Sequence, residues 1–537
     1  MKILFSFSPA IAFSPTKVLL RAIVLTVAGA KGALPFFFTL SLSAQPTIQW
    51  QKAFGGSLYE RANSIVQTTD NGFVTTGQSE STDGDVVGNH GSMDFWVVKM
   101  DSVGIVQWQK SYGGSNIDWS YSIIQTMDQG YVVVGFTESN EGDVSGNHGD
   151  KDMWVLKLDG NGTLEWQKTL GGSGWEEAWS IEQTEDGGYI VAGRSSSNDG
   201  DVTGHHGYLD YWVVKLSTEG GIEWQKSLGG SGLDLGYSVS QTVDGGYIVT
   251  GESDSQDGDI TDNHGSSDYW VVKLNFEGKV EWEKSLGGGG LDRGNDIHQT
   301  REGGYIVFGQ VRSTNGDVTG NHGGYDCWAV KLNETGTIEW QKALGGSNED
   351  YGQSIQQTFE GGYVLAGFTS SNNGDVMGNH GETDAWLLKL TEDGEIQWQR
   401  TLGGTAPERA VSIKETNDKG YIMSGEAWSN DGDVSGVHGK TDFWVVKLSR
   451  LSSPTTTPQT LPLEIFPNPA TNTLSLKLLT KEPTLTLSIT DLLGRELSRQ
   501  TITNGGNANI SALPNGLYLI TATTDSGKVY SGRFRKQ

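Results

Sequence analysis

The stretch IEWQKSLGGSGLDLGYSVSQTVDGGYIVTGESDSQDGDITDNHGSSDYWVVKLNFEG, residues 222–278, decides the fold because close copies of it recur along the chain. Two tryptophans and one histidine each return every 58 residues, with no insertion or deletion between copies. The recurring positions are Trp50, Trp108, Trp166, Trp224, Trp282, Trp340 and Trp398; Trp96, Trp154, Trp212, Trp270, Trp328, Trp386 and Trp444; and His90, His148, His206, His264, His322, His380 and His438. A fixed period of this length indicates a repeat architecture.

Four segments of each unit have the composition of β-strands. In the quoted unit they are YSVSQT, YIVTG, DYWVVKL and VEWEKSL, which are rich in Val, Ile, Tyr and Trp and are separated by glycine-containing turns. No segment sustains a helical period. Four strands in each of seven units predict an all-β protein with a seven-bladed β-propeller of four-stranded blades over residues 45–450.

The two ends of the repeat are incomplete in complementary ways. The chain enters the repeat at the strand around Trp50, which belongs to the outer edge of a blade and precedes any complete unit. At the other end, TDFWVVKL (441–448) has no such outer strand after it. We therefore expect residues 47–54 to pair with residues 442–448 and close the ring, which removes the exposed edges of an open sheet.

The units resemble the seven-bladed bacterial β-propeller repeat family. The matching stretches include LGGSGLD, GGYIVTG and DYWVVKL, and the resemblance covers residues 47 to about 450. It implies a fold rather than an activity, because that family is known mainly as a scaffold in surface and secreted proteins.

A second, shorter β pattern follows the repeat. Residues 451–461 form a Ser/Thr/Pro-rich linker, and in residues 462–537 apolar and polar residues alternate as in a small antiparallel β-sandwich. The pieces FPNPATNTL, ITDLLGREL, LPNGLYLI and GRFRKQ resemble the C-terminal sorting domain of the type IX secretion system of Bacteroidetes. The resemblance implies that the secretion machinery binds residues 462–537 and that the protein is then released or attached to the cell surface. The alternative is a sandwich that binds a ligand of its own.

Residues 1–44 have the features of a signal peptide. Four basic residues precede or flank the apolar run ALPFFFTLSL (33–42), and LSAQ offers a small-residue cleavage site after Ala44. The segment is long for a signal peptide, which suggests a true start downstream of Met1. The alternative is a membrane anchor, although no uncharged apolar run reaches the ~18 residues of a spanning helix. We expect export to the periplasm, then secretion or display on the outer surface, and no transmembrane segment in the mature chain.

Charge and cysteine content narrow the partners. The net charge of −27 argues against binding to nucleic acid or to an anionic membrane, because both require a basic face. The single cysteine, Cys327, excludes an intramolecular disulfide, so stability must come from packing.

The loop DGDVVGNHGSMD, which begins at Asp83, recurs in each unit and is a candidate calcium site. Acidic or amide residues stand at positions 1, 3, 7 and 12 and glycine at position 6, a spacing similar to that of calcium-binding loops. The candidate ligands in three copies are Asp83, Asp85, Asn89 and Asp94; Asp199, Asp201 and Asp210; and Asp431, Asp433 and Asp442. The alternative is a loop held by its own hydrogen bonds, in which His90, Asp94 and Trp96 form one cluster per blade. No cofactor is required, and one histidine per blade disfavours a multi-histidine zinc site.

The connection after each Gly-Gly differs most between the units, and two variable positions are candidates for recognition. They lie 11 residues after the first recurring tryptophan (Arg61, Trp119, Glu177, Leu235, Arg293, Tyr351, Arg409) and 13 residues after it (Asn63, Tyr121, Trp179, Tyr237, Asn295, Gln353, Val411). We place them on the connection after each Gly-Gly, on one face around the ring. The candidate binding residues are Arg61, Trp119, Tyr121, Trp175, Trp179, Tyr237, Arg293, Tyr351 and Arg409, because exposed aromatic faces suit sugars or peptides. The alternative is tolerated drift of a surface.

The sequence favours a binding or adhesion scaffold with a glycan or protein ligand. A secreted hydrolase or lyase that acts on polysaccharide is the alternative, and a purely structural surface-layer role is a third. We assign no catalytic residue, because the chain has no G-x-S-x-G or H-E-x-x-H motif and no isolated carboxylate pair. His205 and His298, the two histidines outside the period, are interpreted as surface substitutions.

Overall fold

A computed structural model describes residues 45–450, 461–477, 484–491, 495–503, 505–524 and 529–537. The predicted signal peptide and almost all of the predicted linker lie outside these residues. The described residues form β-strands and no helix, so none of them makes a helix that could cross a membrane.

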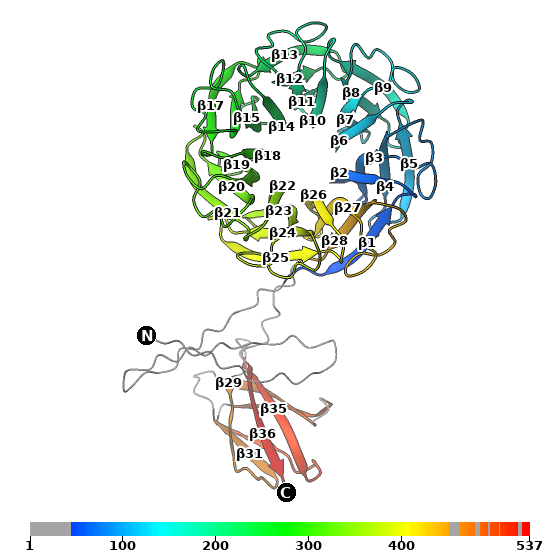
Figure 1. The fold of residues 1–537 in the computed structure, drawn as a ribbon. Coiled ribbons are helices and arrows are strands. Elements are labelled where there is room, and N and C mark those ends of the chain that lie inside the picture. The colour runs from blue at the N-terminus through cyan, green and yellow to red at the C-terminus, as the bar shows by residue number, and fades with distance from the viewer. Residues whose placement is uncertain (1–44, 451–460, 478–483, 492–494, 504, 525–528) are drawn as a thin grey trace. The chain divides into compact units, whose positions relative to one another are not determined.

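Residues 45–450 form seven four-stranded antiparallel sheets arranged as the blades of a ring (Figure 1). The innermost strands surround the centre and are β2 (Glu60–Gln67), β6 (Asp118–Gln125), β10 (Glu176–Gln183), β14 (Asp234–Gln241), β18 (Asp292–Gln299), β22 (Asp350–Gln357) and β26 (Glu408–Glu415). The second strands are β3 (Phe73–Ser79), β7 (Tyr131–Thr137), β11 (Tyr189–Ser195), β15 (Tyr247–Ser253), β19 (Tyr305–Val311), β23 (Tyr363–Thr369) and β27 (Tyr421–Ala427). The propeller predicted from the repeat is confirmed.

The third and outer strands complete each blade. The third strands are β4 (Asp94–Met100), β8 (Asp152–Leu158), β12 (Asp210–Leu216), β16 (Asp268–Leu274), β20 (Asp326–Leu332), β24 (Asp384–Leu390) and β28 (Asp442–Leu448). The outer strands are β5 (Val106–Tyr112), β9 (Leu164–Leu170), β13 (Ile222–Leu228), β17 (Val280–Leu286), β21 (Ile338–Leu344), β25 (Ile396–Leu402) and β1 (Ile48–Phe54).

The first strand of the chain completes the last blade. β1 pairs antiparallel with β28, with Lys52 opposite Val445 and Phe54 opposite Phe443, in a sheet of order β1-β28-β27-β26. The indole N–H of Trp444 donates to Gln51 Oε1 at 2.9 Å across this junction. The extra strand at the N-terminal end of the repeat is therefore the outer strand that the last blade lacks. The predicted closure of the ring is confirmed.

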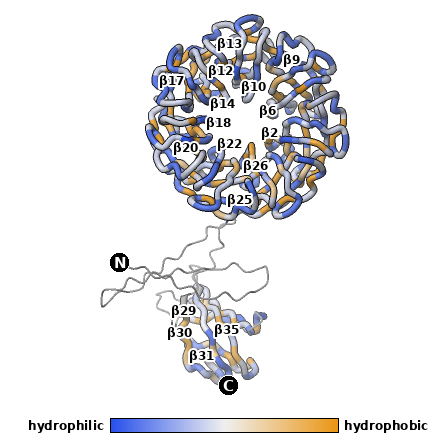
Figure 2. The backbone as a smooth tube through the Cα atoms, viewed as in Figure 1, coloured by the Kyte–Doolittle hydropathy of each residue, from blue (hydrophilic) through white to orange (hydrophobic). Residues whose placement is uncertain are grey.

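The hydrophobic core lies between neighbouring blades. Val134 and Val155 of the second blade pack with Val191 and Trp212 of the third, and the other junctions repeat this arrangement. The third-strand tryptophan of every blade is fully buried. Hydrophobic residues follow the strands and hydrophilic residues gather in the peripheral loops (Figure 2). The constant tryptophans and aliphatic residues of the repeat are thus the residues that join one sheet to the next.

The innermost strands begin earlier than the sequence predicted. In the quoted unit the strand starts at Asp234 rather than at Tyr237, because the buried Asp234 binds the chain there. Its carboxylate accepts hydrogen bonds from the backbone N–H of Gly230 and from the hydroxyl of Ser255, at 2.8 and 2.9 Å. The variable residues between these two starting points therefore belong to a strand and not to a connection.

The C-terminal residues form two small sheets, as the alternating pattern predicted. A five-stranded sheet has the order β29-β36-β35-β32-β33 and a three-stranded sheet has the order β30-β31-β34. The strands are β29 (Leu461–Pro462), β30 (Glu464–Phe466), β31 (Thr473–Lys477), β32 (Thr484–Thr490), β33 (Glu496–Thr503), β34 (Asn507–Asn509), β35 (Gly516–Thr524) and β36 (Val529–Lys536). A core that includes Leu474, Leu487, Ile520 and Phe534 joins the two sheets.

Candidate functional site

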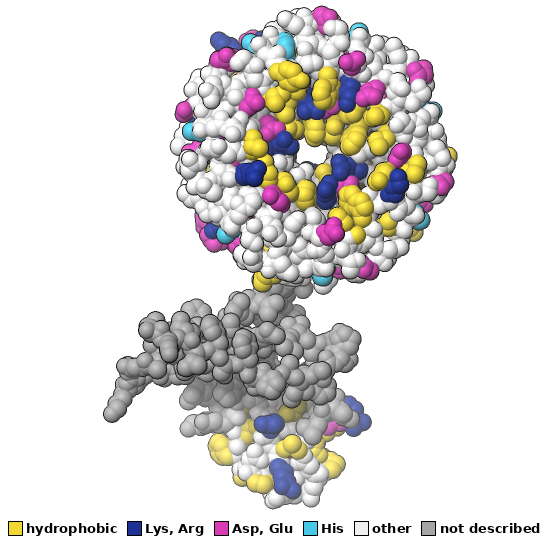
Figure 3. Space-filling view, in the orientation of Figure 1, with side chains coloured by type: hydrophobic (Ala, Val, Ile, Leu, Met, Phe, Trp, Pro, Cys, Tyr) yellow, Lys and Arg dark blue, Asp and Glu magenta, His cyan; other side chains and the backbone are white. Residues whose placement is uncertain are grey.

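The variable positions of the repeat converge on a cavity of about 590 Å³ at the centre of the ring. Hydrophobic and basic side chains gather around the central opening in the space-filling view (Figure 3). Of the candidate binding residues, those that line this cavity are Arg61, Trp119, Tyr121, Trp179, Tyr237 and Arg409. Trp175, Arg293 and Tyr351 are not among its lining residues. The expectation that these residues lie on connections is wrong, except for Trp175, because the others belong to the innermost strands.

A β-bulge in each innermost strand aims these side chains at the channel. The pairing with the second strand shifts register at the same place in all seven blades, for example between Ser120 and Ser122. The bulged residue is left unpaired, so that Tyr121 and the next residue, Ser122, both line the cavity instead of alternating between faces. The second of the two variable positions is thus the bulged residue.

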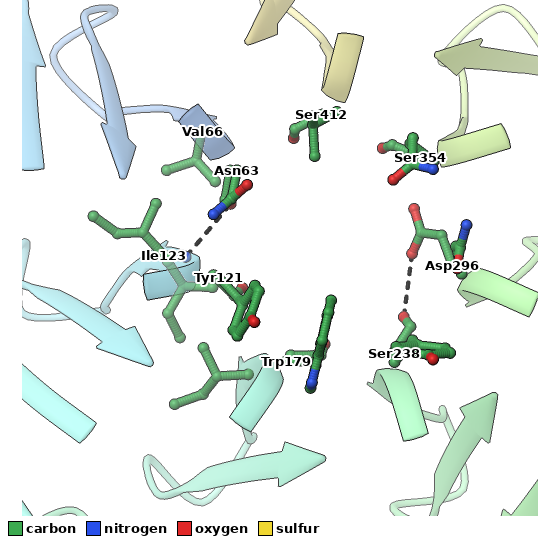
Figure 4. Close-up of a pocket in the computed structure, with 18 of the residues that line it drawn as sticks. Asn63, Val66, Tyr121, Ile123, Trp179, Ser238, Asp296, Ser354 and Ser412 are labelled. Carbon is green, nitrogen blue, oxygen red and sulfur yellow. Dashed lines mark hydrogen bonds between the residues drawn. The ribbon is translucent and has the colours of Figure 1, made fainter. Parts of the chain in front are cut away.

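Aromatic side chains from the second, third and fourth blades form one wall of the cavity. Tyr121 stacks on Trp179 with ring centroids 4.0 Å apart, and Trp179 meets Tyr237 edge to face at 5.0 Å. Trp119 stacks on Phe136 at 6.3 Å. The side chains of Tyr121 and Trp179 extend toward the centre of the channel (Figure 4). The wall is therefore a packed aromatic surface and not a set of isolated exposed rings.

Salt bridges at the mouth of the channel position the arginines. Glu426 accepts Arg61 at 2.7 Å and Arg409 at 3.1 Å, and its own side chain is almost completely buried. Glu252 accepts Arg293 at 2.7 Å. Burial lowers the pKa of Arg293, but the electrostatic effects of Tyr237 and Glu252 outweigh burial and leave that pKa raised. The glutamates are buried while the arginines are partly exposed, so loss of an arginine would leave a buried carboxylate without its partner.

The glutamates that hold these arginines were not among the predicted binding residues. They occupy a second-strand position directly opposite the first variable position, since Arg409 pairs with Glu426 and Glu177 with Arg194. This position also changes from blade to blade: Gln78, Phe136, Arg194, Glu252, Gln310, Phe368 and Glu426. The two opposite positions change together from blade to blade. This covariation would have pointed to the second-strand position, because residues directly opposite one another in a sheet are in contact.

A ring of hydroxyls lies below the aromatic wall and ties the blades together. The residue after the bulge is serine in six blades: Ser64, Ser122, Ser180, Ser238, Ser354 and Ser412. Backbone N–H groups of the following blade donate to these hydroxyls, as Val239 does to Ser180 at 3.2 Å and Ile297 to Ser238 at 3.3 Å. This constant position serves the ring and also faces the cavity (Figure 4).

The fifth blade departs from this ring and carries an aspartate, Asp296. Asp296 accepts the backbone N–H of Ile355 at 2.9 Å and the hydroxyl of Ser238 at 3.2 Å, and His298 Nε2 lies 3.2 Å from its carboxylate. Burial raises the pKa of Asp296, but His298, the charge of Lys414 and the Ile355 N–H outweigh burial and hold it at about 2. Asp296 is therefore ionised at neutral pH.

Neither off-period histidine is a surface substitution, so that interpretation is wrong. His298 lines the cavity, and only 32% of its side chain is exposed. His205 is more buried, with 11% exposed, and its Nε2 lies 2.8 Å from the carbonyl of Gly207. A histidine that has no equivalent in the other units thus marked a place where the structure departs from the repeat.

The floor of the cavity carries three titratable side chains that have no equivalents in the other blades. Glu182, His298 and Lys414 occupy the position two residues beyond the serine ring, where the first two blades have Val66 and Ile124. The Ser238–Asp296–His298 arrangement differs from a nucleophilic triad, because the serine hydroxyl bonds the carboxylate and not the imidazole.

The aspartate-rich loops hold the connections between blades. Asp83 accepts the backbone N–H of Ser57 at 2.8 Å, and Asn89 donates to the carbonyl of Ser79 at 2.9 Å. The same first-position contact recurs as Asp199 with Ser173 at 2.7 Å and Asp431 with Thr405 at 2.9 Å. These contacts are those of capped turns.

The carboxylate at the end of each loop is buried and bonded to the recurring histidine. Asp94, Asp210 and Asp442 lie 2.7, 2.9 and 2.7 Å from Nδ1 of the histidine four residues earlier. Burial raises the pKa of Asp94 and Asp442 although the histidine lowers it. The expected cluster lacks its tryptophan, because the indole N–H of Trp96 donates to Gln109 instead.

The third-position carboxylates contact the start of the connection only weakly. Asp85 and Asp201 accept backbone N–H groups at 3.3 Å, and Asp433 lies 3.9 Å from Arg400. The described residues contain no group of three His, Cys, Asp or Glu placed to hold a metal ion. Calcium binding by these loops stays a prediction.

One family model matches the chain, and it covers the C-terminal domain. Residues 464–534 match the family described as "Secretion system C-terminal sorting domain". No curated protein matches the chain.

Several solved structures are similar to the chain at low identity. The extracellular domain of BT4673 from B. thetaiotaomicron has 12% identity and a TM-score of 0.39, and the match covers 92% of this chain and 59% of that one. Sqt1 from Chaetomium thermophilum has 11% identity and a TM-score of 0.39 over 76% of this chain and 100% of that chain. The structure of puromycin hydrolase has 11% identity and a TM-score of 0.42 over 90% of this chain and 62% of that chain.

The sorting domain indicates export to the cell surface or secretion. The chain is therefore an exported seven-bladed β-propeller protein that carries a type IX secretion sorting domain at its C-terminus.

Proposed function

We propose that the propeller is a surface or secreted binding module whose ligand site is the central cavity, and that its ligand is a glycan or a protein. One observation carries this proposal. The repeat is nearly uniform where it builds the ring, whereas residues that differ from blade to blade line one central cavity. Recognition requires different side chains around one ligand, and the residues that line this cavity provide them.

The chemistry of the cavity supports binding. Rigid aromatic side chains provide contact area at a low entropic cost, and arginines held by salt bridges are already positioned before the ligand arrives. Aromatic and arginine side chains in a concave site are the residue types that dominate binding energy at interfaces. The tryptophan at the centre of the aromatic wall, Trp179, is the residue we expect to contribute most.

The proposal is tested by screening the labelled protein against an array of oligosaccharides and peptides. We expect Trp179→Ala to weaken every wild-type signal by about ten-fold or more. The control is Phe276→Ala, since Phe276 is an exposed aromatic residue in the turn between β16 and β17, outside the cavity. Thermal unfolding of both variants checks that they are folded. Signals that survive in folded Trp179→Ala would place the binding site elsewhere.

A further inference from the structure

The two halves of the cavity differ in chemistry, and this difference indicates what the ligand is. The second to fourth blades supply the aromatic wall. The opposite half, from the fifth, sixth, seventh and first blades, supplies most of the polar groups, Asn295, His298, Gln353, Lys414 and Asn63, beside the apolar Val66, Phe368 and Val411. A ligand that fits both halves has an apolar face on one side and polar groups on the other.

The serine hydroxyls on the polar side are poised to donate into the cavity. Ser412, Ser64 and Ser354 accept backbone N–H groups of Ile65, Ile123 and Ile413, each at 3.4 Å. A hydroxyl that accepts through its oxygen keeps its proton to donate. Among the described residues no acceptor takes the protons of these three hydroxyls, so an acceptor-rich ligand or water receives them.

The asparagines on the same side offer acceptors at the level above. The amide nitrogen of Asn63 donates to Gln78 Oε1 at 3.0 Å and to the carbonyl of Ser120 at 2.7 Å. That of Asn295 donates to Gln310 at 2.8 Å and to Gly352 at 2.6 Å. Both N–H donors of each amide are used, and among the residues that the structure describes no group donates to either side-chain carbonyl oxygen. Donors and acceptors that alternate beside an apolar wall match the hydroxyls and the C–H face of a sugar ring.

Lys414 adds a positive charge to this polar side. It lines the floor of the cavity, and within the described part of the chain no carboxylate lies within ion-pair distance of its amine. Arg61 and Arg409, by contrast, share Glu426. Lys414 is therefore the cation of the cavity lining whose charge is available to a ligand.

Asp296 is the acid of the lining that feels the charge of Lys414, although the two do not form an ion pair. Asp296 is engaged by Ile355, Ser238 and His298, as described above. Glu182 belongs to the third blade, in the aromatic half, and accepts the backbone N–H of Gln241 at 2.9 Å. The net charge of −27 acts at longer range, and it is screened beyond about 8 Å at physiological salt. An anion in contact with Lys414 is therefore shielded from most of the distant negative charge.

We infer that the ligand of the cavity is an acidic saccharide, a uronate whose ring packs on the aromatic wall while its carboxylate binds Lys414 and the serine hydroxyls. This inference rests on the proposed function, because it names the ligand class of the same site. A free peptide C-terminus offers a carboxylate too, but it lacks the ring of hydroxyls that the serines and asparagines match.

The test is calorimetric titration of the purified protein with matched pairs of ligands. Trigalacturonate, triglucuronate and trimannuronate are each compared with the carboxyl-reduced neutral trisaccharide, and a pentapeptide with a free C-terminus is compared with its amide. We expect one acidic trisaccharide to bind roughly ten-fold tighter or more than its neutral counterpart. Lys414→Gln should bring the two affinities together, and Glu182→Gln should raise the affinity for the acid.

Lys419→Gln is the matched control, because it removes the same charge from an exposed lysine of the same blade outside the cavity. It should keep the preference for the acid. Equal affinities within every saccharide pair, a preference that survives Lys414→Gln, or binding of the free peptide alone would each overturn the inference. Binding that depends on Trp179 but not on charge defeats this inference and leaves the proposed function standing, whereas no binding to any probe defeats both.

Discussion

The closure of the ring by β1 can be tested with one pair of substitutions, Gln51→Leu and Gln167→Leu. Gln51 lies on β1 and accepts the indole N–H of Trp444 across the junction between the two ends of the propeller. Gln167 makes the equivalent contact with Trp154 inside the second blade. The two glutamines also share a second contact, since each donates to a serine carbonyl, Ser435 or Ser145, at 3.1 Å.

The structure sets the size of the expected effect. Trp154 and Trp444 are completely buried, so leucine at either glutamine leaves a buried indole N–H without its acceptor. An unsatisfied buried donor costs about 1–3 kcal/mol. Because the surroundings match, we expect the two variants to lose the same stability to within about 0.5 kcal/mol, although one bond spans 13 residues and the other 393.

The assay is urea unfolding followed by tryptophan fluorescence, with the free energy of unfolding taken from the midpoint and slope of the first cooperative transition. Equal losses support a seventh blade built like the others. A normal cost for Gln167→Leu beside no cost for Gln51→Leu would refute the closure, because Trp444 would then have no partner on β1 to lose.

Three further predictions concern pH, calcium and export. Burial raises the pKa of Asp118 and Asp234 to about 6, so the folded state holds these protons more tightly than the unfolded chain does. Their contribution to stability, on the order of 2–3 kcal/mol each, is complete below about pH 4 and is lost as pH rises through 6. The melting temperature, measured from pH 4.5 to pH 7.5 in buffers spaced by about half a unit, should therefore fall. A melting temperature that rises over this range would contradict the account. For calcium, binding by the aspartate loops predicts a higher melting temperature with the ion than with a chelator, and coincident curves would leave capping as the role of the loops. Deletion of residues 462–537 should leave the propeller inside the cell envelope, and its normal appearance outside the cell would show another export route.

The uniform part of the fold was predictable because each constant residue acts through a contact that every blade repeats. The third-strand tryptophans and the short turns defined the sheets, and the mismatch of the two ends of the repeat defined the closure. These are pairings between neighbouring strands, and a fixed period transfers one unit's contacts to all the others.

The cavity was predicted less well, because its geometry depends on contacts that the period hides. The buried Asp234 extends the innermost strand over residues that resemble a loop, and the bulge turns Tyr121 and Ser122 to the same side. Asp296 and His298 lie two residues apart on one innermost strand, with Nε2 of His298 3.2 Å from the carboxylate. The identity of the variable residues was thus visible in the sequence, while their convergence on a single channel was not.

The central claim is that constant residues build the ring and variable residues recognise the ligand. The most direct measurement uses one variant that places asparagine at the bulge position of the first five blades: Tyr121→Asn, Trp179→Asn and Tyr237→Asn together, since Asn63 and Asn295 already occupy this position in two of them. We expect the variant to melt in a cooperative transition, as the native ring does, and to lose every signal on the oligosaccharide array. A variant that keeps its array signals, or that fails to form the ring, would contradict the claim.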